Sequence, residues 1–75
     1  MSRLADLPIG SRARVSHVAG DGEVSARLLE MGLTPGVEVL LVGRAPLGDP
    51  LELELRGYRL SLRKAEAAGV EVELV

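Results

Sequence analysis

Alternating apolar and polar positions run through most of this chain and predict a protein built mainly of β-strands. Residues 12–18 alternate with a period of two, as in a strand that is buried on one face. Residues 37–44 begin with the same alternation and then become continuously apolar, so we expect both faces of this strand to be covered. Residues 70–74 alternate valine or leucine with glutamate, and the glutamates favour an exposed edge strand.

The clearest part of the pattern is a β-hairpin, in which alternate leucines stop near Gly57 and then resume. A turn at residues 56–57 would place Glu54 opposite Arg59, a register that charge pairing favours. A turn at residues 57–58 would give Gly57 the positive φ of a type II′ turn. Both registers keep the leucines on one face, so the pattern fixes the core face and leaves the choice of turn open.

One short helix is expected between the first two strands. Asp21 can cap this helix, and Glu23 lies near its positive end. An apolar stripe at helical spacing is expected to face the core, and it consists of Val24, Leu28 and Met31. A second helical turn is expected at residues 64–68, before the last strand.

The helix is followed by a cluster of turn residues. Gly32 is expected at a positive φ after the last helical turn, where Leu33 can fold back on Leu28 in a Schellman motif. Pro35 and Gly36 then predict a type II turn, because proline suits the second position of that turn and glycine the third. Four residues are thus assigned to structural turns: Gly32, Pro35, Gly36 and Gly57.

Length and composition indicate one small domain that spans residues 1–75. A chain of this size buries roughly 60% of the surface that its unfolded form exposes, so its core must be efficient. The chain is 47% hydrophobic but has one Tyr and no Phe or Trp, so that core must be aliphatic. About five short antiparallel strands, one inserted helix and one helical turn predict a small, mainly β, SH3-like barrel.

Charge and residue types exclude several classes of function. Nine Lys and Arg against eleven Asp and Glu give a net charge of −2, without the basic excess of nucleic-acid-binding modules. The absence of cysteine excludes disulfides and thiolate zinc sites. No apolar run is long enough for a membrane span or a signal peptide, so we expect a cytoplasmic location.

The polar residues form no recognisable catalytic, cofactor or metal site. His17, Asp21 and Glu23 resemble a group of metal ligands, but a strand-end histidine beside a helix cap explains them better. The sole histidine has no orienting motif beside a serine nucleophile, and the glycine spacing fits neither the Walker motif nor GxGxxG. We therefore expect no enzyme activity, no metal ligand and no cofactor. The serines considered as nucleophiles are Ser16, Ser25 and Ser61.

Two groups of residues are candidates for surface binding. Four apolar residues exceed what the predicted core needs: Leu29, Leu33, Pro46 and Leu47. They predict an exposed apolar patch, shared by the helix and the loop of residues 45–50, that docks a partner. Four arginines would form a positive stripe near the hairpin: Arg44, Arg56, Arg59 and Arg63. Interleaved glutamates favour a solvated face over a binding site there.

Several of these motifs occur together in an order that is similar to one protein family. The GDGE start of the helix, the MGLTPG stop, the APLGDP loop, the RGYRLSLR hairpin and the VEVE strand resemble the FeoA family of bacterial ferrous iron transport proteins. The resemblance extends over nearly the whole chain and includes LADLPIG at the start.

The resemblance implies a non-enzymatic cytoplasmic partner of FeoB, the membrane ferrous iron permease that carries a cytosolic GTPase domain. On this hypothesis the chain docks on FeoB and modulates transport without inserting into the membrane. The alternative is a regulatory SH3-like module that binds a protein or peptide, because the same fold occurs as a terminal domain in iron-dependent repressors of the DtxR type. Self-association is left open by both hypotheses.

Overall fold

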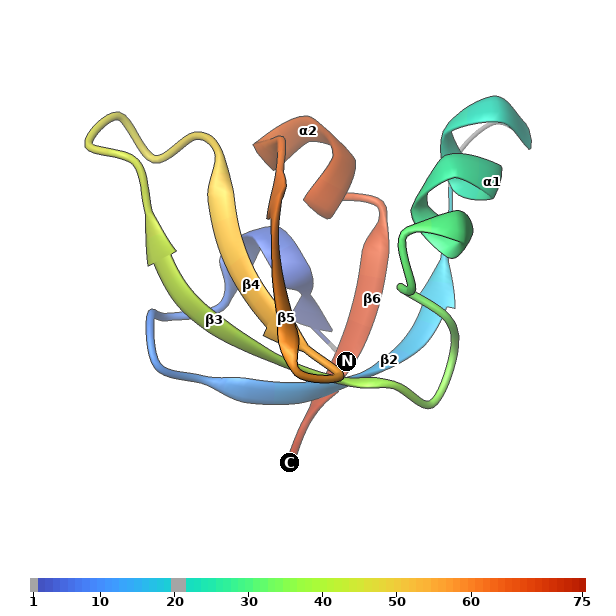
Figure 1. Ribbon diagram of the computed structural model, residues 1–75, viewed down its shortest axis with the longest axis horizontal. Helices are drawn as coiled ribbons and strands as arrows, with labels where there is room; N and C mark the ends of the chain where they lie inside the picture. Colours follow the sequence, from blue (N-terminus) through green and yellow to red (C-terminus); the bar gives the residue numbers. More distant parts are fainter. Residues whose placement is uncertain (1, 20–21) are drawn as a thin grey trace.

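The computed structural model describes residues 2–19 and 22–75, and its strands form one antiparallel sheet of six strands (Figure 1). The strand order is β1-β6-β2-β3-β4-β5. The bounds are β1 (Ser2–Arg3), β2 (Arg12–Val18), β3 (Glu38–Arg44), β4 (Leu51–Leu55), β5 (Tyr58–Leu62) and β6 (Val70–Leu74). The helices are a 3-10 turn η1 (Leu4–Asp6), α1 (Gly22–Glu30) and α2 (Lys64–Ala67). None of the described helices is long and apolar enough to cross a membrane.

The architecture confirms the predicted mainly β fold, with one short helix between the first two long strands and a helical turn before the last strand. The sheet curls round its apolar face, and α1 and α2 stand beside its open end (Figure 1). The barrel is not closed, because β1 and β5 lie at the two ends of the strand order without pairing to each other. The side of β5 that faces away from β4 is therefore one edge of the sheet.

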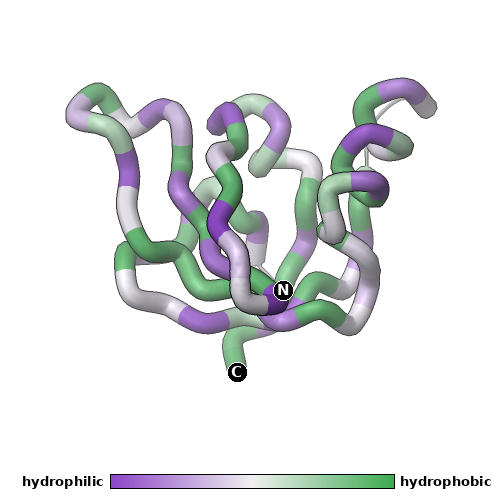
Figure 2. The backbone as a smooth tube through the Cα atoms, in the orientation of Figure 1, coloured by the Kyte–Doolittle hydropathy of each residue, from purple (hydrophilic) through white to green (hydrophobic). Residues whose placement is uncertain are grey.

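The core is aliphatic, as the composition requires. Hydrophobic and hydrophilic positions alternate along the strands (Figure 2). No charged or polar residue is buried in the described part of the chain. The largest fully buried side chains are Leu4, Leu28, Leu33, Leu41, Leu51, Leu53, Leu55, Leu62, Val15, Val39, Val70 and Val72. One face of each main strand therefore supplies the core, and α1 adds Leu28 to it.

The first residues form structure that the hydrophobic pattern does not reveal. β1 pairs with β6, and Leu4 and Leu7 are buried. The guanidinium of Arg44 donates hydrogen bonds to the carbonyls of Ala5, at 3.1 Å, and Leu7, at 2.5 Å. Arg44 thus fastens the amino-terminal segment to β3 and does not belong to a positive stripe near the hairpin.

Two strand predictions need correction. β6 is not an edge strand, because it pairs with β2 on one side and with the two-residue β1 on the other. β3 is not fully covered on both faces, because Leu40 and Val42 are half-buried whereas Val39 and Leu41 are buried. In both cases the burial of the strand depends on the segment that lies alongside it, which the run of residue types does not determine.

The end of α1 has the hydrogen bonds of a Schellman motif. The amide of Leu33 donates to the carbonyl of Leu28 at 3.1 Å, and the amide of Gly32 donates to Leu29 at 3.0 Å. Gly32 has a φ of +103°, a conformation that favours glycine. The cap assigned to Asp21 lies outside the described residues.

Two turns then set the direction of the strands. The amide of Val37 donates to the carbonyl of Thr34 at 3.1 Å, and Gly36 has a φ of +95°, as in a type II turn. In the hairpin, Leu55 pairs with Tyr58, so the turn comprises residues 56–57. Both of these residues have positive φ, which is typical of a type I′ turn. The register that places Glu54 opposite Arg59 is therefore the observed one.

Candidate functional site

The four residues predicted to form an apolar docking patch do not share one surface. Leu47 is 96% exposed and Leu29 is 40% exposed, and Pro46 is also exposed. Leu33, in contrast, is fully buried, because the Schellman motif folds it back into the core. Leu33 must therefore be removed from the predicted surface.

The remaining residues lie on two separate parts of the molecule. α1 stands at one side of the open end of the sheet, and the loop between β3 and β4 stands at the opposite side (Figure 1). The predicted contiguous patch is therefore wrong, because Leu29 belongs to α1 whereas Pro46 and Leu47 belong to this loop. What remains is two separate apolar positions that flank the open end.

The loop that carries Leu47 is tightly closed. The amide of Gly48 donates to the carbonyl of Ala45 at 2.7 Å, and the amide of Ala45 donates to the carbonyl of Pro50 at 3.0 Å. The peptide bond between Asp49 and Pro50 is cis. These contacts present Leu47 at the tip of a defined turn, where its side chain makes little contact with the rest of the fold.

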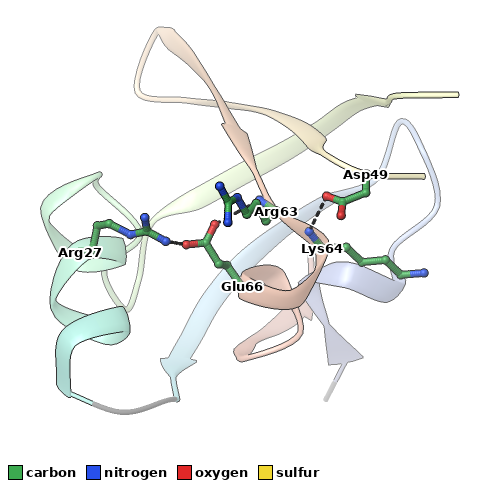
Figure 3. Close-up of polar contacts among 5 residues, drawn as sticks. All are labelled: Arg27, Asp49, Arg63, Lys64 and Glu66. Carbon is green, nitrogen blue, oxygen red and sulfur yellow. Dashed lines mark hydrogen bonds and ion pairs between the residues drawn. The ribbon is translucent and has the colours of Figure 1, made fainter. Parts of the chain in front are cut away.

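A depression of about 660 Å³ lies between α1, the β3–β4 loop, β5 and α2. It is lined by Arg27, Met31, Asp49, Pro50, Ser61, Arg63 and Glu66. Part of this lining is charged, and Figure 3 shows how those side chains meet. The depression therefore offers a polar surface between the two exposed apolar positions.

Glu66 joins the two helices beside this depression. Its Oε1 accepts a hydrogen bond from the amide of Arg63 at 3.2 Å, which caps the first turn of α2. Its Oε2 is buried and forms an ion pair with the guanidinium of Arg27 on α1 (Figure 3). The Glu66 side chain is 13% exposed and the Arg27 side chain 58% exposed, so the pair is partly shielded from water.

A second carboxylate fixes the loop to α2. Oδ1 of Asp49 accepts a hydrogen bond from the amide of Lys64 at 2.9 Å (Figure 3). This contact holds the end of the β3–β4 loop against the start of α2. Both carboxylates that line the depression are thus engaged by groups of the chain itself.

Of the described candidates for metal binding or catalysis, Ser61 alone lines the depression. His17 is exposed on β2, and the described residues contain no cluster of three or more His, Asp or Glu that would hold a metal ion. The hydroxyl of Ser16 donates to the carbonyl of Glu71 at 3.0 Å. Asp21, which completes the grouping with His17 and Glu23, lies outside the described residues.

The chain is similar to known proteins over nearly its whole length. The FeoA domain model matches residues 2–74. A curated relative from Porphyromonas gingivalis, an Fe(2+) transport protein A/Fe(2+) transporter FeoB fusion protein, is 41% identical over 73 residues. That match covers 97% of this chain, and the chain spans 9% of the length of the fusion protein.

Solved structures show the same fold. A FeoA-like protein from Clostridium acetobutylicum is 38% identical, with a TM-score of 0.90 over 100% of this chain and 91% of that one. FeoA from Stenotrophomonas maltophilia, solved in complex with zinc and described as an SH3 domain protein, is 32% identical. Its TM-score is 0.83, and the match covers 97% of this chain and 91% of that one. The SH3-like prediction is thereby confirmed, and the chain belongs to the FeoA domain family.

Proposed function

We propose that this chain is a non-enzymatic accessory domain of bacterial ferrous iron uptake that binds the FeoB permease and modulates transport. The observation that carries the proposal is the Porphyromonas gingivalis relative, in which a homologous segment is fused to FeoB. Covalent fusion keeps two domains at a high effective concentration, which favours their association. A separate chain with the same fold would need a binding surface to achieve the same association.

The proposed binding surface includes Leu29 on α1 and Pro46 and Leu47 on the β3–β4 loop. These side chains are exposed although they are apolar, and the tightly closed loop holds Leu47 away from the core. Two apolar positions on either side of a charged depression fit a partner that spans the open end of the sheet. The proposal places the chain in the cytoplasm, beside the cytosolic domain of FeoB.

No catalytic role is assigned to the chain. The hydroxyls of Ser16 and Ser25 lie against main-chain carbonyls, at 3.0 Å from Glu71 and 3.5 Å from Gly22. His17, the sole histidine, is an exposed strand residue. An effect on FeoB would therefore come from binding, through the conformations that the partner adopts when the chain is bound.

Binding of the purified chain to detergent-solubilised FeoB, measured by calorimetry or biolayer interferometry, tests the proposal. We expect saturable binding, and a change in iron transport when FeoB is reconstituted in vesicles with the chain. FeoB that lacks its cytosolic domain is the matched control and should not bind. Failure of the intact permease to bind would reject this proposal in favour of a regulatory SH3-like module with another protein partner.

A further inference from the structure

The free edge of β5 is built to accept another strand. β5 is last in the strand order and pairs with β4 alone. Leu55 and Tyr58 flank a two-residue turn and form a hydrogen-bonded pair, and such pairs alternate along an antiparallel ladder. The main-chain groups of Leu60 therefore face β4, whereas those of Arg59 and Ser61 face outward. No described main-chain group pairs with them on that side.

The side chains along this edge are basic. Residues 56–65 contain Arg56, Arg59, Arg63 and Lys64 but no carboxylate, although the whole chain has a net charge of −2. Arg59 forms a long ion pair with Glu54, at 3.8 Å, between largely exposed side chains. Arg63 and Lys64 form no ion pair with another described residue. Positive charge thus remains available at Arg63 and Lys64, whereas Arg59 lies opposite Glu54 on β4.

Ser61 of this edge strand lines two depressions. A smaller depression, of about 240 Å³, is lined by Glu52, Arg59, Leu60 and Ser61. The depression described above, beside α1 and α2, is also lined by Ser61 and continues to Arg63. Its two carboxylates already bind the chain's own groups, so Arg63 is the side chain left to meet an incoming anion.

From these observations we infer that the β5 edge binds an extended acidic segment of another protein by strand addition. The outward main-chain groups of Arg59 and Ser61 pair with the added segment, as in other cases of β-augmentation. Directly opposite residues point to the same face, so carboxylates at alternate positions of the segment meet Arg59 and Arg63. The inference does not require binding to FeoB, and it shares with the proposed FeoB surface only the depression that Ser61 and Arg63 help to line.

Charge favours an acidic segment over a second copy of this chain. Pairing β5 with β5 of a second molecule would gather Arg59 and Arg63 from both copies on one ladder that lacks carboxylates. Charged residues on edge strands commonly prevent such self-association. The same arginines attract a segment of opposite charge, so the edge discriminates between the two kinds of partner.

A titration followed by NMR tests the inference, with a blocked peptide of alternating glutamate and valine as the probe. We expect the largest amide shifts at Arg59 and Ser61, slower hydrogen exchange at these two amides, and weaker binding at high salt. A peptide of alternating lysine and valine is the matched control and should not bind. An acidic peptide that leaves the Arg59 and Ser61 amides unchanged would overturn the inference.

Two variants separate strand addition from general charge attraction. Ser61→Pro removes an outward amide without breaking the β4–β5 ladder, so the variant should fold and lose peptide binding. Arg63→Glu should weaken binding about tenfold through charge reversal, and Arg63→Lys should largely restore it. Unchanged binding by a folded Ser61→Pro variant would overturn strand addition. Concentration-dependent dimers that shift the same amides without peptide would instead identify a second copy as the occupant and also overturn it.

Discussion

The hydroxyl of Tyr58 donates a hydrogen bond of 2.5 Å to the main-chain carbonyl of Met31 and so joins the β4–β5 hairpin to the end of α1. The last carbonyls of a helix have no partner within the helix and must find one elsewhere. A second contact runs parallel to the first, because the guanidinium of Arg56 lies 3.4 Å from the hydroxyl of Thr34. The hairpin therefore supports both the end of the helix and the turn that follows it.

Tyr58→Phe tests the contribution of this hydrogen bond. The phenyl ring is kept while the donor is lost, so we expect the free energy of unfolding to fall by about 0.5–1.5 kcal/mol. The loss should lie near the lower end, because Tyr58 is 44% exposed and water can replace the hydroxyl. Urea unfolding of both proteins measures the difference. A variant as stable as the parent would show that this contact does not hold the helix.

Gly32→Val should be more damaging than the loss of the hydroxyl. A φ of +103° is strained for a branched residue, and a Cβ at this position would lie 2.4 Å from the Tyr58 hydroxyl oxygen. We expect a loss of more than the ~1–2 kcal/mol of left-handed strain alone, measured by thermal unfolding. An unchanged melting temperature would contradict the Schellman assignment.

The combination of Gly32→Val with Tyr58→Phe serves as the control for that prediction. Removing the hydroxyl relieves the close contact but leaves the backbone strain at position 32. The double variant should therefore recover part of the loss and remain less stable than Tyr58→Phe. Complete recovery would show that the contact alone, and not the positive φ, excludes a side chain.

Leu29→Glu combined with Leu47→Glu tests the proposed FeoB surface. Exposed substitutions usually change stability by within ~0.5 kcal/mol, so the melting curve should barely move. Binding to FeoB should weaken by ~2 kcal/mol or more if either side chain is an interface anchor. Each single variant should be measured as well, because the two positions lie on separate elements. Full binding by the folded double variant would exclude this surface.

Leu28→Ala provides the contrasting case on the same helix. Leu28 is fully buried, whereas its neighbour Leu29 is 40% exposed. Truncation of a core leucine costs ~2–5 kcal/mol, so this variant should be strongly destabilised. We expect FeoB binding by Leu28→Ala to fall only in proportion to the fraction of the variant that is unfolded. That result would distinguish a folding defect from the loss of a direct contact with FeoB.

Glu66→Gln probes the connection between the two helices. The amide keeps an oxygen for the main chain of Arg63 but loses the charge that pairs with Arg27. We expect a loss of about 1 kcal/mol that is reduced at high salt. Glu54→Gln is the matched control. Glu54 pairs with Arg59 at 3.8 Å between more exposed side chains, so this ion pair should contribute less to stability. Equal effects of both variants would show that partial burial does not strengthen the pair.

Ferrous iron should bind the purified chain no better than weakly. The sequence contains no cysteine and one histidine, so thiolate ligands and multiple imidazole ligands are not available within one molecule. Anaerobic calorimetric titration with ferrous iron measures this directly, with His17→Ala as the control. A tight stoichiometric site that disappears in the control would contradict the prediction and identify His17 as a ligand.

Local residue chemistry made the turns predictable. Gly32 and Gly36 adopt the positive φ expected from their type, because such a backbone conformation depends little on distant contacts. The hairpin was harder, since Arg56 adopts a φ of +51°, which is uncommon for a residue with a side chain. Its cross-strand charge pair, and not its turn residues, indicated the right register.

Features that depend on distant segments could not be predicted. β1 has two residues and exists because β6 lies beside it, and no periodicity can appear in so short a segment. Leu33 lies outside the apolar stripe predicted for the helix, but the Schellman motif that ends the helix buries its side chain. The pair of Arg27 and Glu66 joins two helices through the fold, and the separation of Leu29 from Leu47 follows from the curvature of the whole sheet.

The position of β6 between β1 and β2 has a consequence for how the domain folds. β2, β3, β4 and β5 pair in sequence order; the β3–β4 and β4–β5 pairings close short loops, and the β2–β3 pairing encloses α1. Val15 of β2, however, pairs with Val72 of β6, which lies near the other end of the chain. The entropy of closing this long loop must be overcome before the contact contributes any packing energy, and such pairings slow folding. During synthesis, the second edge of β2 therefore remains unpaired until the last strand has left the ribosome.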